Sequence, residues 1–241
     1  MKATPNDQQA ILELQRLDDQ LASLAQREAN LPETLALNST VIKRNNVRDL
    51  RIAAETERTD VKRELSRAEG DVEQIVTRIQ RDEARLNSGT GTPKELEQTQ
   101  HELVTLGQRR TELEEAELTI MVQVEGITNR INELSAEEEK LNAEIADLEI
   151  KRENALTVII NERNSVSEKR AAVAAPIAQE LKDLYSKLAA DNNGNGAALL
   201  VGNECKGCHL TINTTEVQRI STLSADEVVR CEQCRCILVR G

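Results

Sequence analysis

Apolar residues recur at alternating steps of three and four along residues 8–86, and the positions between them are polar. This spacing places the apolar side chains on one face of an α-helix, so we predict a long helix over this segment. Asn30 and Pro32 resemble the cap and the first turn of a new helix, which predicts a kink near 30–32. The spacing is clearest at Leu65, Ala68, Val72, Ile75, Ile79 and Leu86.

A run of turn formers, residues 87–93, follows this helix and contains two glycines and Pro93. Such a run ends a helix and allows the chain to reverse. We predict that a second helix begins near Pro93 and runs antiparallel to the first.

The second helix carries the strongest periodic pattern in the chain. From Leu103 to Val173, 21 positions follow steps of three and four, and 15 of them are apolar. A repeat of 3.5 residues sustained over ten heptads predicts a left-handed coiled coil with a partner helix. The apolar positions are Leu103, Leu106, Leu113, Ile120, Val124, Ile127, Ile131, Leu134, Leu141, Ile145, Leu148, Ala155, Ile159, Val166 and Val173.

The charges indicate that the partner is the first helix of the same chain. If the turn folds the helices back, residue i faces a residue near 180 minus i. Residues 43–67 carry eight Lys or Arg against five Asp or Glu, whereas residues 113–137 carry one Arg against six Glu. Repeated pairs fix register even though an exposed pair is worth under about 1 kcal/mol. The predicted pairs are Glu117 with Arg63, Glu138 with Lys43 and Arg152 with Glu28.

The C-terminal part of the sequence has a different character. Ala175-Pro176 should end or kink the second helix at 175–176. Residues 191–196 are rich in Asn and Gly and predict a linker, and β-branched runs follow it. We therefore expect a mainly α protein: a long antiparallel coiled-coil hairpin over 1–190, a linker, and a small β domain over 197–241.

Composition agrees with narrow apolar stripes. Phe and Trp are absent and Tyr185 is the single aromatic residue, so burial must come from aliphatic side chains. The formal net charge of −11 opposes binding to phosphate backbones and anionic lipid. No apolar run approaches the roughly 20 residues that span a bilayer, and the N-terminus lacks the apolar segment of a signal peptide. We expect a cytoplasmic protein with no membrane segment.

Two Cys-x-x-Cys units, Cys205/Cys208 and Cys231/Cys234, lie 22 residues apart. Each tight turn can present two thiolates to one tetrahedral ion, so the four cysteines predict one structural Zn²⁺ in a closed site. A domain this small has too little core to fold without the metal. Cys236 and His209 adjoin the ligands and could in principle replace one, but we interpret both as non-ligands.

Several stretches carry a resemblance to a known family: Pro93–Leu96 after the turn, residues 113–121 and, most specifically, Gly202–Cys208. Together with the hairpin they cover nearly the whole chain. The sequence resembles the bacterial C4-type zinc-ribbon coiled-coil family, once catalogued as a domain of unknown function. The resemblance implies an elongated hairpin with a terminal zinc ribbon that acts as an adaptor. Some members are linked to flagellar or type III export and to the alternative sigma factor sigma-54. Where the family usually has Gly-Arg after the last ligand, this chain has Arg235-Cys236.

We expect a non-enzymatic adaptor that binds protein partners. The alternative is a nucleic-acid-binding protein that acts through the ribbon, as zinc ribbons often do. Residues 203–241 balance five acidic against five basic side chains and hold no aromatic residue for base stacking, which argues against it. An enzyme is disfavoured because His101 and His209 lie far apart in the predicted hairpin, and carboxylates on a two-helix rod are solvated.

Overall fold

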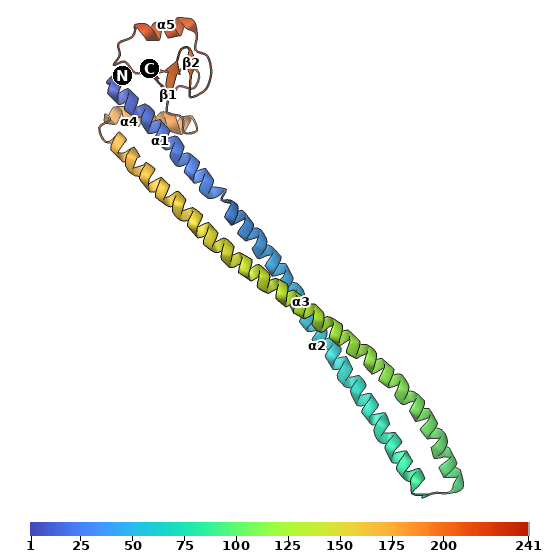
Figure 1. Ribbon diagram of the computed structural model, residues 1–241. Helices are drawn as coiled ribbons and strands as arrows, with labels where there is room; N and C mark the ends of the chain where they lie inside the picture. Colours follow the sequence, from blue (N-terminus) through green and yellow to red (C-terminus); the bar gives the residue numbers. More distant parts are fainter. Residues whose placement is uncertain (241) are drawn as a thin grey trace. The chain divides into compact units, whose positions relative to one another are not determined.

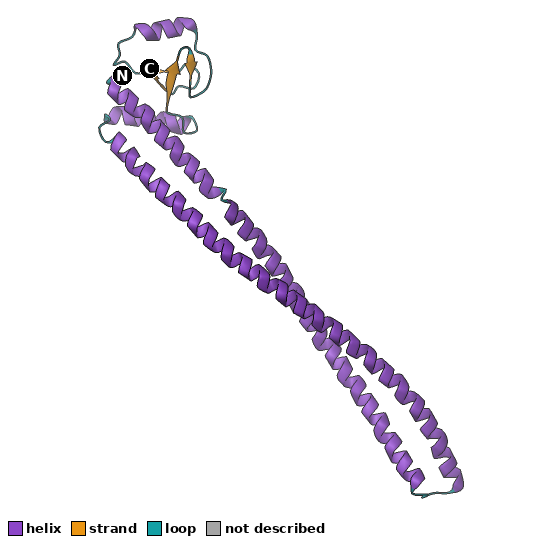
Figure 2. Ribbon diagram, in the orientation of Figure 1, coloured by secondary structure: helices purple, strands orange, loops and turns teal. Residues whose placement is uncertain are grey.

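The computed structural model describes residues 1–240 and confirms the predicted fold class. Long helices form an antiparallel hairpin, labelled in Figure 1, and a small sheet follows them near the C-terminus (Figure 2). Among the described residues, no helix is long and apolar enough to cross a membrane. The elements are α1 (Pro5–Ala29), α2 (Pro32–Asn87), α3 (Pro93–Ala174), α4 (Gln179–Asp191), β1 (Ala197–Val201), β2 (Glu204–Cys205), α5 (Thr214–Thr222), β3 (Val229–Arg230) and β4 (Ile237–Arg240).

The first helical segment is interrupted where the sequence predicts a kink, but Asn30 has a different part in it. Asn30 is the C-cap of α1: its backbone N–H and its side-chain amide both donate to the carbonyl of Gln26, at 3.1 and 2.9 Å. Pro32 then begins α2, where a missing N–H costs nothing. The expectation that Asn30 caps the second segment is therefore wrong, because its side chain satisfies the end of the first.

The turn between α2 and α3 ends in a reciprocal cap at the start of α3. The backbone N–H of Thr92 donates to the Glu95 carboxylate at 2.7 Å, and the N–H of Glu95 donates to Thr92 Oγ1 at 3.4 Å. This capping box satisfies donors that the first helical turn cannot. The same hydrogen bonds from Thr92 hold the pKa of Glu95 below its ordinary value.

Contacts group the chain into two compact units that divide the long helices between them. One unit is Ala36–Leu148, and the other joins Met1–Leu35 to the described residues from Glu149 onward. The sequence-based division at 191–196 follows composition, whereas this grouping follows packing. The division into hairpin, linker and ribbon stays a prediction.

In the unit Ala36–Leu148, α2 and α3 run antiparallel and bury only a few side chains. Arg51 spans the seam, donating to Glu138 of α3 at 2.8 Å and to Glu55 of its own helix at 2.7 Å. These two carboxylates raise the pKa of Arg51. The buried seam residues are Leu37, Thr40, Val47 and Ala54 of α2, and Thr99, Leu106 and Ile131 of α3.

The charge pairs correct the predicted register. Glu138 pairs with Arg51, eight residues beyond the expected Lys43. In the other unit, Glu28 pairs with Arg163 at 3.0 Å, eleven residues beyond the expected Arg152. A heptad pattern repeats every seven residues, so several registers can bring the apolar faces together, and the apolar pattern alone does not decide between them.

The sheet has the strand order β2-β1-β4-β3, with β1 and β4 parallel and the outer pairs antiparallel. The central pair aligns Ala197 with Ile237 and Ala198 with Leu238. Alternate residues of these strands enter two different cores, because successive side chains of a strand point to opposite faces. Ala198 and Leu238 pack around the cysteines, whereas Ala197 and Ile237 pack against helices.

The helix-facing core joins the N-terminus, α4 and the sheet. Ile11 and Leu14 of α1 pack with Leu181 and Tyr185 of α4 and with Val239 of β4. The hydroxyl of Tyr185 donates to Asp18 at 2.7 Å, and Arg170 of α3 also binds Asp18. Gly196 is required here, since a Cβ at this position would lie 2.7 Å from the Tyr185 ring. The helices α1 and α4, which are far apart in the sequence, thus share one core with the sheet.

Two buried glutamines of α1 hold the backbone around the sheet. Gln15 Oε1 accepts from the N–H groups of Gly196 and Ala197 at 2.7 and 3.1 Å, and its Nε2 donates to the Gly194 carbonyl at 2.9 Å. Gln8 Nε2 donates to the carbonyls of Ala3 and Ala225, each at 3.0 Å. These side chains satisfy backbone groups that burial has removed from water.

We predict that Gln15→Ala destabilises this unit by about 2 kcal/mol or more, because it leaves buried N–H groups without an acceptor. Urea denaturation of the zinc-loaded protein measures the loss, and hydrogen exchange at Gly196 and Ala197 should accelerate. Gln26→Ala, at an exposed position of the same helix, is the matched control and should change stability by under about 0.5 kcal/mol. Equal stability of the two variants would contradict this account of Gln15.

Candidate metal centre

The four predicted ligands come from two similar turns of the ribbon. Cys205 ends β2 and Cys208 lies in the turn after it, while Cys231 directly follows β3 and Cys234 lies in the turn before β4. Each turn closes in the same way. The N–H of His209 donates to the Cys205 carbonyl at 2.8 Å, and the N–H of Arg235 donates to the Cys231 carbonyl at 2.9 Å. Two equivalent turns therefore present two sulfurs each.

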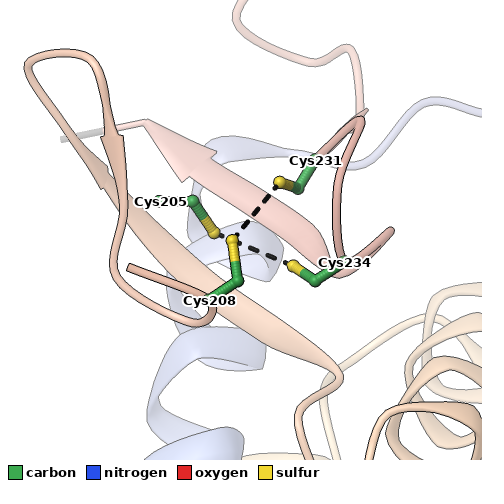
Figure 3. Close-up of side chains that lie close together, drawn as sticks. All are labelled: Cys205, Cys208, Cys231 and Cys234. Carbon is green, nitrogen blue, oxygen red and sulfur yellow. Dashed lines mark hydrogen bonds between the residues drawn. The ribbon is translucent and has the colours of Figure 1, made fainter. Parts of the chain in front are cut away.

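The structure brings all four sulfurs together, within 4.8 Å of one another (Figure 3). Cys205 Sγ lies 3.9 Å from Cys234 Sγ, and Cys208 Sγ lies 3.9 Å from Cys231 Sγ. A tetrahedron with Zn–S bonds of about 2.3 Å has edges of about 3.8 Å. The sulfur positions thus fit one tetrahedral zinc ion.

Backbone N–H groups point at the sulfurs and favour their thiolate forms. Burial raises the pKa of Cys205, and the amides of Gly207 and Cys208 act in the opposite direction. Burial also acts to raise the pKa of Cys231, but donors at Gln233 and Cys234 outweigh it, so that this pKa is lowered. A bound cation adds to this effect, because zinc displaces the thiol protons.

Gly207 lets the first turn approach the sheet closely. A Cβ at this position would lie 2.9 Å from the Ala198 side chain, which belongs to the same core as the cysteines. The Gly207 carbonyl also accepts a hydrogen bond from the Asn195 amide at 2.8 Å. The site is therefore attached to the chain that leads into β1.

Cys236 lies beside the cluster without belonging to the set of four. Its Sγ is 3.2 Å from Cys234 Sγ and 3.8 Å from Cys205 Sγ, and the side chain is fully buried. Burial raises the pKa of the Cys236 thiol far above its ordinary range, as expected for a neutral thiol packed in a core. Its counterpart in the first turn is Leu210, since the N–H of Cys205 bonds the Leu210 carbonyl just as the N–H of Cys231 bonds the Cys236 carbonyl.

Most of the chain matches two known protein domains. Residues 14–193 match the CT398-like coiled coil hairpin domain, and residues 205–238 match the C4-type zinc ribbon domain. The chain belongs to the CT398-like zinc-ribbon coiled-coil family. In this family context the four clustered cysteines form a C4-type zinc ribbon with one structural Zn²⁺.

Relatives of this CT398-like protein match over more than nine-tenths of their length. Rv2229c of Mycobacterium tuberculosis is 34% identical over 244 residues, covering 100% of this chain and 98% of that protein. ML1638 of Mycobacterium leprae is 27% identical over 227 residues, covering 90% and 93%.

Solved structures show the same architecture. A protein from Mycobacterium smegmatis superposes with a TM-score of 0.88 at 31% identity, covering 100% of both chains. CT398 from Chlamydia trachomatis superposes with a TM-score of 0.73 at 19% identity, covering 98% of both chains. HP0958 from Helicobacter pylori superposes with a TM-score of 0.54 at 16% identity, covering 99% of this chain and 98% of that one. The last two show a shared fold alone.

Arg235 has a backbone conformation that glycine adopts most readily. Arg235 has φ of 64° and His209, at the equivalent position of the first turn, has φ of 59°. Glycine adopts this left-handed conformation readily, whereas other residues pay a steric cost. A glycine would fit this geometry without strain, and this CT398-like chain places an arginine there.

The buried glutamines of α1 were missed as supports of the ribbon. Gln8, Ile11 and Gln15 follow helical spacing. Two polar residues on an otherwise apolar helix face indicate that this face contacts polar groups. Periodicity alone predicts that such a face packs against another helix. It does not reveal that the glutamines bind the backbone of the zinc-ribbon unit.

We predict about one zinc per chain, and that Cys205→Ser and Cys231→Ser lose it, since each removes one of four ligands. The affinity loss should exceed the roughly tenfold to hundredfold cost of changes outside the ligand shell. Metal analysis of the purified variants measures bound zinc, and circular dichroism measures their helix content. Cys236→Ser is the control and should retain zinc, so that loss of metal in this variant would identify Cys236 as a ligand.

Arg235→Gly should stabilise the ribbon by about 1 kcal/mol, because glycine relieves the left-handed conformation. Slower zinc loss to a chelator and a higher urea midpoint are the measurements. Arg230→Gly serves as the control: it lies in β3 and should be destabilising by about 0.5–1 kcal/mol. If both changes destabilise alike, strain at Arg235 does not limit the ribbon.

Proposed function

We propose that this protein is a non-enzymatic zinc-ribbon adaptor that binds other proteins. The observation that carries the proposal is the closed metal centre, whose four sulfurs lie within 4.8 Å of one another and leave no coordination position for water or substrate. The metal then has a structural task. Binding would fall to the outer faces of the helices and the ribbon.

Polar side chains outside the metal centre bond one another, which supports a structural role for them. The buried Tyr185 hydroxyl is engaged with Asp18, and burial together with this hydrogen bond raises the pKa of Tyr185 far above its ordinary value. Asp18 in turn accepts a second bond from Arg170 at 3.1 Å. Since Tyr185 is 1% exposed, its hydroxyl offers no surface to a substrate.

The alternative, nucleic-acid binding through the ribbon, is disfavoured because four of the five basic side chains between residues 203 and 240 have intramolecular partners. Arg219 makes two bonds to Glu216, at 2.7 and 2.5 Å, and Lys206 pairs with Glu204 at 2.7 Å. Arg240 donates to five backbone carbonyls, and Arg230 donates to the carbonyl of Arg235. Nonspecific binding draws on counterion release by unpaired cations.

We place the protein in the cytoplasm as part of this proposal. The zinc site needs four thiolates, and a reducing compartment keeps such thiols from forming disulfides.

We predict that labelled single- and double-stranded DNA and RNA bind the full-length zinc-loaded protein more weakly than about 10 μM at 0.15 M salt. Fluorescence anisotropy at several salt concentrations measures this. Submicromolar binding that disappears in Arg235→Ala would favour the nucleic-acid alternative. Retained affinity in that variant would place any nucleic-acid site outside this turn.

Affinity purification of the tagged full-length protein tests the adaptor proposal directly. Reproducible recovery of defined protein partners, insensitive to nuclease, is the expected result. Recovery of no partner, or of proteins that nuclease treatment releases, would contradict it.

A further inference from the structure

Three large apolar side chains project from one turn of α3 into solvent. Leu118 is 59% exposed, Met121 is 46% exposed and Val122 is 68% exposed. Their spacing of i, i+3 and i+4 places them next to one another on the helix surface. We name these three residues the outer patch.

The outer patch faces away from the seam with α2. Ile120, Val124 and Ile127 of the same segment are partly buried on the seam side. At 3.6 residues per turn, Leu118 and Val122 lie about 160 to 200° around the helix from Ile120, whereas Met121 lies about 100° from Ile120 and about 60° from Val124, beside the seam. The partner helix of the hairpin therefore does not cover the patch, and residues 118–127 are apolar on two opposite faces.

Acidic residues bracket the outer patch along the helix. Glu114 and Glu115 lie one turn before Leu118, and Glu125 lies one turn after Val122. Between residues 111 and 129, α3 carries no Lys or Arg. Glu114 pairs with Arg110 at 2.7 Å, whereas the exposed Glu115 and Glu125 make no ion pair among the described residues.

We propose that the outer patch is the docking site for a basic amphipathic helix of a partner protein. Apolar residues of that helix would cover Leu118, Met121 and Val122, and its Lys or Arg residues would meet Glu115 and Glu125. The proposal rests on the adaptor function and names the chemistry of one partner surface. Two helices pair through apolar residues at this spacing, and complementary charges set orientation and specificity.

A second copy of this chain is a poorer occupant of the same surface. Pairing the patch with itself would bring two sets of Glu115 and Glu125 together, and like charges across an interface disfavour association. The chain as a whole carries a formal charge of −11, which adds to the repulsion. Charge complementarity thus favours a basic partner.

The test uses the full-length zinc-loaded protein and two fluorescent helical peptides. Both peptides carry leucines at heptad a and d positions; one has lysines at the flanking positions and the other has glutamates. The patch variant is Leu118→Ser with Val122→Ser, and the matched control is Ile42→Ser with Leu50→Ser, two exposed apolar residues of α2. Glu115→Lys with Glu125→Lys reverses the charge. Circular dichroism checks that each variant keeps its helices.

We expect the lysine peptide to bind at least about tenfold more tightly than the glutamate peptide at 0.15 M salt. The patch variant should lose at least about tenfold in affinity, as removal of central apolar anchors does, while the control stays within about twofold. The charge-reversed variant should prefer the glutamate peptide. Binding of neither peptide below about 100 μM, or equal losses in the patch variant and the control, would overturn the proposal.

Sedimentation and affinity purification separate the remaining outcomes. A dimer that the patch variant abolishes would assign the patch to a second copy and overturn the proposal. If the wild type and the patch variant recover the same partners, the docking site is wrong and the adaptor function stands. If the wild type recovers no partner, the adaptor function itself fails.

Discussion

The zinc–thiolate cluster is the interaction on which the C-terminal part of this structure depends. The strands there are two to five residues long, and three of the eight buried residues in the core between them are cysteines. Such short strands bury too little apolar surface to hold a sheet by themselves. One ion bound by two turns fixes the ends of β2 and β3 and the approach to β4. Once these are fixed, β1 and β4 can lie side by side.

The orientation of β1 and β4 then determines what the helices can contact. Ala197, Ile237 and Val239 point away from the cysteines and complete a core with α1 and α4. The N-terminal residues extend the same association, because the N–H of Ala3 donates to the Asp226 carbonyl and the backbone of Lys2 pairs with that of Glu227 in an isolated antiparallel β-bridge. The ribbon thus packs against α1, near the N-terminus, and against α4, which precedes the sheet. We infer that loss of zinc would loosen these contacts as well as the turns.

The hairpin is stabilised differently, by aliphatic side chains on narrow stripes and by charge pairs across the seam. Because exposed pairs contribute little individually, their main effect is to select one register among several with equal apolar matching. A narrow stripe also leaves most of each helix surface free. This makes a surplus of apolar side chains on an outer face noticeable at residues 118–122, and it is why we interpret that turn as a binding surface.

The helices, their breaks and the four clustered cysteines follow from local properties of the sequence. Apolar spacing reports on one helix at a time, Pro and Gly end helices through their own backbone restrictions, and Cys-x-x-Cys places two sulfurs in one turn. Partners distant in the chain are different. The pairing of Arg51 with Glu138 and the bonds from Gln15 to Gly196 and Ala197 were decided only by tertiary packing. A heptad repeat permits several registers, and a buried glutamine does not specify which distant backbone group it will bind.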